Sequence, residues 1–486
     1  MQMNALSLMS VIVRTDSYKF SQWLQYPEDT VNVSSYIESR GGEKESVFFG
    51  LQAFIKDYLC TPITMQDINY AELIVTAHGL PFNRAGWEII LNEYGGYLPL
   101  EIEAVPEGTV MATHNVQVQV KVIDGEKRLG WLTSYVETIL LRGVWYPSTV
   151  ATKSRKMKKF IAAALRKTSD VPVDMQIMFK LHDFGARGAS SGETAVLGGM
   201  AHLVNFMGTD TFESLIGVMK YYNTTAIVGF SIPASEHSTI TSWGRENEIL
   251  AYENMINKFA GEGKIYACVS DSFDIYAACR DLWGTRLKDK IIAAGGTLVV
   301  RPDSGDATTV PIEIIEILAE KFGFTVNSKG YKVLPPYIRV IQGDGINEHT
   351  LPIILDNLIA KGFSTENIAF GMGGGLLQAW NRDTLKYAMK ASARQDSTGV
   401  WHGFSKDPIT DHGKKSKEGR LGLIVSGGIG GSGFMTVPKE VADNRGNVLR
   451  IVYRTGKLLI EDTFEQIRER AALKESEYVF DITDRF

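Results

Sequence analysis

The sequence predicts an α/β fold: an irregular parallel β/α barrel-like core and a second, β-rich α/β domain built from both chain ends. Short apolar runs alternate with helical patterns through the middle of the chain. The flanks instead carry alternating and hairpin-like patterns. We therefore expect residues 151–394 to form the core. Residues 1–150, some segments of which contribute to the core, and residues 395–486 form the second domain.

The middle of the chain contains six apolar runs that are rich in β-branched residues. Unbroken apolar runs suit strands buried on both faces, as parallel sheets require. The runs are 177–185, 226–233, 264–272, 296–306, 337–345 and 367–375. Apolar residues at helical spacing lie between them, at 245–260, 310–322 and 345–361. Six successive β-α units predict a parallel barrel, complete or irregular, with an open doubly wound sheet as the alternative.

The two flanks predict antiparallel strands. Residues 116–123, "VQVQVKVI", alternate strictly, which is typical of a half-solvated strand. Residues 447–462 predict a hairpin that turns near Thr455 and Gly456. Residues 406–420 are polar, basic and glycine-containing, which indicates a loop. Because strand patterns lie near both ends of the chain, we expect the two ends to form one domain together.

Composition excludes several classes of function. The chain has 486 residues, 44% of them hydrophobic and 22% charged, as in ordinary globular proteins. Its net charge of −5 argues against an electrostatic nucleic-acid binder. The three cysteines form no CxxC pair, which indicates a reducing compartment without structural zinc. The sequence shows no signal peptide and no apolar stretch of about 18 residues, so we expect a cytoplasmic protein that does not bind membranes.

Polar residues concentrate where the predicted strands end. The motifs are "HDFGARG" (182–188), "RPDSGD" (301–306) and "QGDG" (342–345). Parallel α/β folds bind ligands at the carboxyl edge of the sheet, where the strand-to-helix loops converge. Tight turns alone require Gly and Asp but not this whole set of charged and aromatic residues. We therefore expect these loops to form one active site.

The glycine run "FGMGGGLLQ" (370–378) is a candidate phosphate site. Glycines let backbone amides approach a phosphate, and a helix that follows adds its dipole. The alternative is a tight turn. We expect Arg382 and Lys390 on the following helix, about two turns apart on one face, where they would continue a phosphate path.

Carboxylates at strand ends are candidates for sugar or magnesium binding. Asp303 and Asp344 suit hydroxyl pairs of a sugar, or magnesium held through water and phosphate. Asp306 is equally a candidate helix N-cap. Arg301 could instead pair with Asp303, although two charges at a strand end are costly without a ligand.

Two further features concern a ring ligand and a single histidine. Phe184 and Arg187 in one loop suit a flat ring that acquires positive charge, with burial of Phe184 in the core as the alternative. His237 lies in "FSIPASEHSTITSWG" (230–244), with no second His or Cys close enough for a metal pair. Taken alone, it is an ordinary surface or capping histidine.

Assembled in order, these motifs resemble the nicotinamide phosphoribosyltransferase family, one of the type II phosphoribosyltransferases. The matching segments cover nearly the whole chain. They are "TDSYKFSQWLQYP" (15–27), "SYIESRGG" (35–42), "LHDFGARG", "GTDT" (208–211), "PASEHSTI", "VSDSFDIY", "RPDSGD", "LPPYIRVIQGDG", "ENIAFGMGGGLLQ" and "FSKDP" (404–408). The resemblance implies that nicotinamide and phosphoribosyl pyrophosphate are converted into nicotinamide mononucleotide and pyrophosphate in NAD salvage. It also implies a homodimer with shared active sites, together with ATP and magnesium (Mg2+).

The resemblance assigns a role to each candidate residue. Phe184 and Tyr18, the latter from the other subunit, sandwich the nicotinamide ring. Asp210 accepts from the carboxamide, and Arg187 and Arg301 line the pocket. The ribose is held by Asp303, Gly343 and Asp344. The 5′-phosphate is held by Gly373, Gly374 and Arg382. The diphosphate or the ATP phosphates are bound by Arg40, Lys390, Lys406 and Lys414. The chain has Ala388 where the family often has a serine, so this phosphate pocket is expected to lack one donor.

The resemblance also gives His237 a function, as the residue that ATP phosphorylates. A carboxylate that fixes the imidazole tautomer makes the other nitrogen a competent acceptor. Asp274 is the candidate for this carboxylate, and Glu236 is the alternative. Two other functions stay open: a nicotinate phosphoribosyltransferase, and a non-catalytic regulatory binder on the same scaffold.

Overall fold

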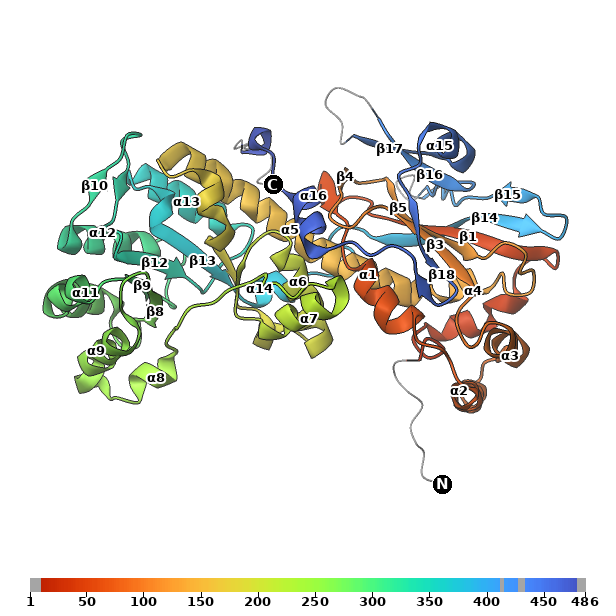
Figure 1. The fold of residues 1–486 in the computed structure, drawn as a ribbon, viewed down its shortest axis with the longest axis horizontal. Coiled ribbons are helices and arrows are strands. Elements are labelled where there is room, and N and C mark those ends of the chain that lie inside the picture. The colour runs from red at the N-terminus through yellow and green to blue at the C-terminus, as the bar shows by residue number, and fades with distance from the viewer. Residues whose placement is uncertain (1–9, 411–414, 427–432, 479–486) are drawn as a thin grey trace. The chain divides into compact units, whose positions relative to one another are not determined.

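The structure, a computed structural model, describes residues 10–410, 415–426 and 433–478 (Figure 1). It divides into two units. Unit 1 comprises the described parts of Met1–Thr152, Val218–Thr224 and Asn381–Ala471, and unit 2 those of Lys153–Gly217, Thr225–Trp380 and Ala472–Phe486. These limits differ from the expected ones, because residues 381–394 belong to unit 1 and residues 472–478 to unit 2.

Unit 2 contains a six-stranded parallel sheet. Its order is β7-β6-β13-β12-β9-β8. The strands are β6 (Leu181–Asp183), β7 (Gly208–Thr209), β8 (Ile265–Val269), β9 (Thr297–Arg301), β12 (Ile338–Gln342) and β13 (Ile368–Met372). Strands β8, β9, β12 and β13 are almost entirely buried, as their unbroken apolar runs predict.

The segment 230–234 links the two edges of this sheet. Phe230 bridges Gly208 of β7 and Ala234 bridges Ala267 of β8, both in parallel. Each bridge is isolated, so the predicted strand 226–233 is not a regular strand. Pro233 contributes to this irregularity because it has no N–H to donate to a ladder. The predicted irregular barrel is confirmed, and the open doubly wound sheet is not observed.

Helices surround the strands of unit 2 (Figure 1). Three of them were predicted from apolar spacing: α9 (Glu248–Phe259), α12 (Val310–Phe322) and α13 (Thr350–Ala360). The others are α6 (Gly192–Leu203), α8 (His237–Thr241), α10 (Ile275–Ala277), α11 (Lys288–Ala294) and α14 (Gly374–Leu377). Helix α7 (Phe212–Tyr222) and the long helix α5 (Glu137–Thr168) each contribute residues to both units.

Unit 1 is built on a seven-stranded antiparallel sheet. Its order is β15-β14-β1-β5-β3-β18-β19. The strands are β1 (Thr30–Glu38), β3 (Leu100–Ala104), β5 (Val116–Val122), β14 (Ala388–Asp396), β15 (Trp401–Gly403), β18 (Arg450–Arg454) and β19 (Lys457–Leu458). The predicted hairpin is confirmed: β18 and β19 flank Thr455 and Gly456, whose φ values are +41° and +76°. Because β1 pairs with both β5 and β14, the sheet joins the two ends of the chain.

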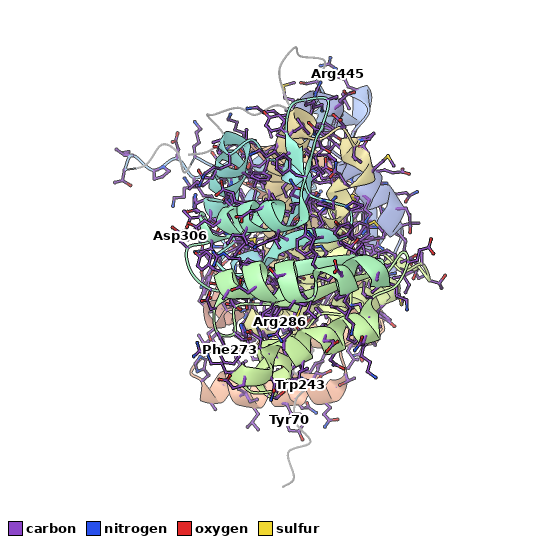
Figure 2. All side chains as sticks on the ribbon, turned by 90° about the vertical axis from the view of Figure 1, so that its left-hand side faces the viewer. Tyr70, Trp243, Phe273, Arg286, Asp306 and Arg445 are labelled. Carbon is purple, nitrogen blue, oxygen red and sulfur yellow. The ribbon has the colours of Figure 1, made fainter. Side chains whose placement is uncertain are left out.

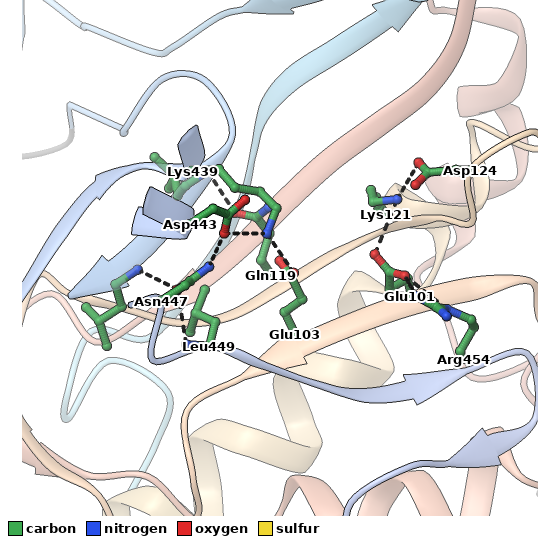
Figure 3. A network of polar contacts seen from close by, with 12 residues as sticks. Glu101, Glu103, Gln119, Lys121, Asp124, Lys439, Asp443, Asn447, Leu449 and Arg454 are labelled. Carbon is green, nitrogen blue, oxygen red and sulfur yellow. Dashed lines mark hydrogen bonds and ion pairs between the residues drawn. The ribbon is translucent and has the colours of Figure 1, made fainter. Parts of the chain in front are cut away.

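Strand β5 is confirmed, but the prediction that it is half solvated is wrong. Its valines face the core, and its other face, formed by Gln117, Gln119 and Lys121, is also buried. A layer from the carboxyl-terminal part of the chain covers that face: β16 (Leu421–Val425), β17 (Phe434–Pro438) and α15 (Lys439–Arg445). Leu421 N donates to Gln119 Oε1 at 2.8 Å, and Lys121 lies between Asp124 and Glu101 (Figure 3). Hydrogen bonds and ion pairs therefore replace solvent on this face.

Smaller elements complete unit 1. They include η1 (Ser17–Leu24), α1 (Leu51–Phe54), η2 (Ile55–Leu59), α2 (Met65–Ala77), α3 (Arg84–Glu93), α4 (Leu132–Tyr135), α16 (Phe464–Ala471) and the strand pair β2 (Glu45–Val47) and β4 (Val110–Ala112). Thr64 and Asp67 form a capping box that starts α2. No described helix is both long enough and apolar enough to cross a membrane.

Candidate active site

The carboxyl ends of the unit 2 strands carry most of the candidate residues. Because the strands are parallel, their carboxyl ends lie at one edge of the sheet. Phe184 directly follows β6, Asp210 follows β7, and Gly343 and Asp344 follow β12. The other candidates that follow these strands are Asp303, Gly373 and Gly374, and Asp271, which the sequence analysis did not single out, follows β8. The fold thus brings together residues that lie far apart in the sequence.

A cavity of about 400 Å³ lies within this barrel. Its polar lining includes Asp210, Ser231 and Arg301, and its apolar lining includes Phe184 and Ile341. Cavities of this size, mostly apolar with a few polar groups, are typical of small-molecule sites. The lining continues to the amino ends of the strands, at Gln176, Phe179, Lys180, Arg339 and Glu366. Burial there lowers the pKa of Lys180 to about 7, with the neighbouring Arg339 adding to the effect.

Phe184 is a half-buried wall of the cavity that also packs against the small core cluster Ala267, Val299 and Ile341. Its amide donates to Met372 O at 2.9 Å, which fixes the loop against β13. Its ring lies on Gly371, where a side chain would place its first carbon 2.0 Å from Phe184 Cε2. Glycine at 371 therefore leaves the space that the ring fills. Arg187, two residues after Gly185 in the same loop, is exposed.

Asp183, which sequence analysis did not single out, is a buried carboxyl beneath this loop. Its Oδ1 accepts from Gly185 N at 2.7 Å, and its main-chain oxygen accepts from Asp210 N at 2.8 Å. Burial, together with a smaller contribution from the nearby Asp210 charge, raises the pKa of Asp183 to about 6. Asp183 therefore connects the Phe184 loop to the Asp210 loop.

Asp210 lies at the cavity and is not a helix cap. Ser231 Oγ donates to Asp210 Oδ1 at 2.5 Å. Just before α7, Thr209 Oγ1 accepts a hydrogen bond from Thr211 N at 3.0 Å. No described helix amide donates to the Asp210 carboxylate. Ser231 was missed in the sequence, where the only signal is one hydroxyl in the apolar run "FSIP".

Arg301 and Asp303 lie together at the end of β9. Arg301 Nε is 3.7 Å from Asp303 Oδ1, a loose ion pair. This Nε is buried and has no hydrogen-bond partner within the described structure. Buried donors are rarely left unpaired, so it is available to a ligand. Asp303 Oδ1 also lies against Gly343, where a first side-chain carbon would come within 3.2 Å of it.

Asp344 and Asp306 differ in what holds them. Asp344 is exposed, and the one hydrogen bond that it accepts from a described residue reaches its main-chain oxygen, from Gln342 Nε2 at 2.8 Å. Asp306, at the surface of unit 2 (Figure 2), accepts from Thr308 N at 2.8 Å just before α12. Asp306 thus serves the local turn before α12. The interpretation of Asp306 as a helix N-cap is wrong, because the N-cap of α12 is Thr309. The Asp344 carboxylate is available to a ligand.

His237 begins helix α8 and contacts a carboxylate, but not the expected one. Its Nε2 lies 2.8 Å from Asp271 Oδ1. Asp274 is the N-cap of α10 and accepts from Tyr276 N and Ala277 N, each at 3.0 Å. The Asp274 prediction is therefore wrong, because those two amides occupy its Oδ1. The side chain of the alternative, Glu236, accepts from Ser238.

The glycine run is confirmed as a strand-to-helix turn, but the expected long helix after it is wrong. Helix α14 has four residues, and Lys390 lies on strand β14 of unit 1. A side chain at Gly374 would meet no atom within 4 Å, so the space in front of it is open. Arg382 also belongs to unit 1, where it donates to Tyr387 O at 2.9 Å.

Unit 1 holds the other basic candidates. Burial lowers the pKa of Lys390, and the nearby charges of Arg40, Arg382 and Lys19 lower it further, although Glu137 opposes them. Lys390 and the exposed Tyr18 line a polar cavity of about 260 Å³. The remaining candidates are Lys406, which is exposed, Ala388, which is buried on β14, and Lys414, which lies outside the described residues.

Comparison with known proteins decides the family. The family model described as nicotinate phosphoribosyltransferase (NAPRTase) family matches residues 179–480, and the model of the nicotinamide phosphoribosyltransferase N-terminal domain matches residues 10–102. The chain belongs to the nicotinate phosphoribosyltransferase family. It is accordingly an enzyme of the pentosyltransferase class. The resemblance seen in the sequence motifs is confirmed.

Relatives and solved structures agree with this family. A nicotinamide phosphoribosyltransferase from Xanthomonas campestris is 51% identical over 96% of this chain and 98% of its own. Another from Acinetobacter baylyi is 32% identical over 94% and 96%. The crystal structure of a nicotinate-nucleotide pyrophosphorylase from Pyrococcus furiosus superposes with a TM-score of 0.61 at 15% identity, covering 99% of both chains. The phosphoribosyltransferase fold therefore extends over both units of the described structure.

Proposed function

We propose that this enzyme transfers phosphoribosyl from phosphoribosyl pyrophosphate to nicotinamide, and releases nicotinamide mononucleotide and pyrophosphate. The observation that carries the proposal is the Asp210 carboxylate at the wall of the barrel cavity. A carboxylate accepts from an amide N–H but repels the carboxylate of nicotinate. The names of the two relatives support the same substrate.

The cavity supports binding of a flat aromatic amide. Phe184 offers a ring face backed by Gly371, and Asp210 offers a hydrogen-bond acceptor. Arg301 offers the unpaired Nε donor, which is suited to the amide oxygen. Stacking and two polar contacts orient the ring nitrogen for attack on the ribose, a contribution of positioning.

The strand ends support the sugar and its leaving group. Breaking the bond between ribose C1 and the diphosphate oxygen gives positive charge on the sugar and negative charge on the pyrophosphate. Asp303 and Asp344 suit the sugar, with Gly343 leaving room for it. Gly373 and Gly374 suit the 5′-phosphate. In our proposal the cations Arg40, Arg382, Lys390 and Lys406 receive the phosphates, and Tyr18 covers the nicotinamide ring.

Magnesium fits this site as a companion of the diphosphate. The described residues contain no group of three His, Cys, Asp or Glu that could hold a metal ion by themselves. Magnesium characteristically uses one or two carboxylates together with substrate phosphates. Asp303 and Asp344 supply such carboxylates, and the ion would neutralise the leaving group when bound.

ATP coupling is proposed to act through His237. Because a carboxylate can only accept, the contact with Asp271 assigns the hydrogen to Nε2 and leaves the lone pair on Nδ1. Nδ1 attacks the γ-phosphorus of ATP, the bond to the bridging oxygen breaks, and ADP leaves with the electron pair. Water later hydrolyses the phosphohistidine, which restores the neutral imidazole. The coupling draws an unfavourable synthesis forward.

We further propose a cytoplasmic homodimer in which Tyr18 and Arg40 serve the partner's site. Two other functions compete, a nicotinate phosphoribosyltransferase and a non-catalytic regulatory binder. One assay distinguishes all three: the purified protein is incubated with phosphoribosyl pyrophosphate and either nicotinamide or nicotinate, with and without ATP. Nicotinamide mononucleotide formed with ATP hydrolysis supports the proposal. The acid mononucleotide, or no product, contradicts it.

A further inference from the structure

Ser231 and Asp210 form a pair at the wall of the barrel cavity. Ser231 belongs to the segment 230–234, and Asp210 directly follows β7. The Ser231 hydroxyl donates to Asp210 Oδ1 at 2.5 Å, and both side chains line the cavity next to Phe184. Hydrogen bonds to a charged acceptor are short and about twice as strong as neutral ones. This bond therefore restrains the carboxylate.

Main-chain bonds hold the backbones of both residues in place. Asp210 N donates to Asp183 O at 2.8 Å. Next to Ser231, Phe230 N donates to Met207 O at 2.7 Å, and Phe230 O accepts from Thr209 N at 3.0 Å. The barrel is closed by these backbone bonds and bridges, none of which involves the Ser231 hydroxyl. Loss of that hydroxyl should therefore leave the fold intact.

The restraint affects which oxygen of Asp210 a ligand meets. The terminal torsion of an aspartate is broad, so an unrestrained carboxylate turns freely. Ser231 occupies Oδ1, while no hydrogen bond from another described residue reaches Oδ2. A carboxylate held in this way presents one fixed acceptor to the cavity.

We infer that Ser231 is a specificity-determining positioning residue. Its hydroxyl fixes the Asp210 carboxylate so that Oδ2 accepts from the carboxamide of nicotinamide and faces the carboxylate of nicotinate. This inference rests on the proposed function. Without the hydroxyl, the Asp210 carboxylate turns, so attraction to the amide and repulsion of the acid both weaken.

The test measures kcat/KM for nicotinamide and for nicotinate in wild type and in five variants, one of which is a control. Ser231→Ala should lower kcat/KM for nicotinamide by about tenfold, mainly through KM, and raise relative nicotinate use. Ser231→Thr keeps the hydroxyl and should keep the wild-type ratio. Adding Ser231→Ala to Asp210→Ser should change the ratio no further, because the carboxylate that Ser231 restrains is already gone.

Thr297→Val is the matched control. Thr297 lines the same cavity at the amino end of β9, and its hydroxyl donates to Pro336 O at 2.9 Å. The Thr297→Val variant loses a hydroxyl in the same cavity, but it should keep the wild-type ratio of kcat/KM for nicotinamide to that for nicotinate. An unchanged ratio in Ser231→Ala, with wild type active on nicotinamide, overturns the inference and leaves the proposed function standing. The inference is also overturned if Ser231→Ala changes the ratio as much in the Asp210→Ser background as in wild type. A wild-type protein without activity on nicotinamide overturns both the inference and the proposed function.

Discussion

Asp271 accepts a hydrogen bond from His237 Nε2 at 2.8 Å, and the carboxylate is almost fully buried while the imidazole is nearly half exposed. This arrangement fixes the ring through Nε2 and leaves the lone pair on Nδ1. No described residue hydrogen-bonds to Nδ1. An oriented base with one accessible lone pair is what a phosphoryl acceptor requires.

The first prediction concerns His237 itself. His237→Ala should abolish phosphoenzyme formation and ATP hydrolysis, because the acceptor nitrogen is removed. Mononucleotide synthesis should persist at high phosphoribosyl pyrophosphate, since the transfer chemistry uses other residues. The measurement is acid-labile phosphate on the protein after incubation with ATP. Labelling of the variant at the wild-type level would contradict the assignment.

The second prediction separates Asp271 from Asp274. Asp271→Ala should slow phosphoenzyme formation by about 10²-fold or more, because the imidazole loses its orientation and tautomer. Asp274→Ala should leave that rate unchanged and lower stability by about 1 kcal/mol, because only a helix cap is lost. Rapid-quench labelling and thermal unfolding of both variants make the comparison. The reverse pattern would return the role to Asp274.

The third prediction tests the shared site. Tyr18→Ala and Asp303→Ala proteins should each be inactive, because each lacks one part of every site. Mixed subunits that exchange should regain activity at one of the two sites of each hybrid dimer. Exchange is followed with two affinity tags, and activity is measured on the doubly tagged fraction. Hybrids that form without activity would rule out the trans role of Tyr18.

The fourth prediction tests the choice between amide and acid. Asp210→Ser removes the charge and keeps a polar side chain. It should weaken nicotinamide use and relieve the exclusion of nicotinate, changing discrimination by about 2 kcal/mol, or a factor of about 30. The measurement is kcat/KM for both substrates. If the ratio stays constant, another residue decides the preference.

The fifth prediction concerns a buried carboxyl of unit 1. Glu107 accepts from Gln52 N and from Tyr222 Oη, and burial raises its pKa to about 7. A raised pKa means that the folded state holds the proton more tightly than the unfolded state. The stability from this group is complete below its unfolded pKa of about 4.3 and is lost as pH rises towards and through 7.

Glu107→Gln should therefore flatten the decline in stability between pH 5 and about 8. The measurement is thermal unfolding of variant and wild type across this range. Lys180 and Asp183 also titrate there, but both proteins contain them, so the difference isolates Glu107. Parallel curves for the two proteins would show that Glu107 does not titrate in this range.

The sequence predicted five of the six sheet strands of unit 2, because buried parallel strands carry local apolar runs, but it missed the two-residue strand β7. It could not reveal what covers a strand. The polar face of β5 is buried beneath β16, β17 and α15, and no local pattern encodes those partners. The sequence also could not show which side chains contact one another. Asp271 and Asp274 lie in one motif, and only the point where β8 ends and α10 begins decides which one meets His237.

Lys390 shows a second kind of limit. Helical spacing from Arg382 was plausible only if the helix after the glycine run continued. Asn381 instead starts a turn, in which its side chain accepts from Asp383 N at 2.8 Å. Asn, like Asp, favours turns because its side chain bonds to nearby backbone. That signal was present in the sequence and would have placed Lys390 beyond the helix.

The pairing of β1 with β14 has a consequence for how this protein is made. Thr30 pairs with Asp396, so the amino-terminal strands emerge from the ribosome long before their neighbours exist. The strands of unit 2 are synthesised between these two segments, and the strands that they pair with lie closer in the sequence. Only α5 and the end of the described chain add more distant segments to unit 2. Distant pairings form slowly and expose unpaired edges meanwhile. During synthesis, the incomplete sheet of unit 1 is therefore the part that most needs protection by chaperones.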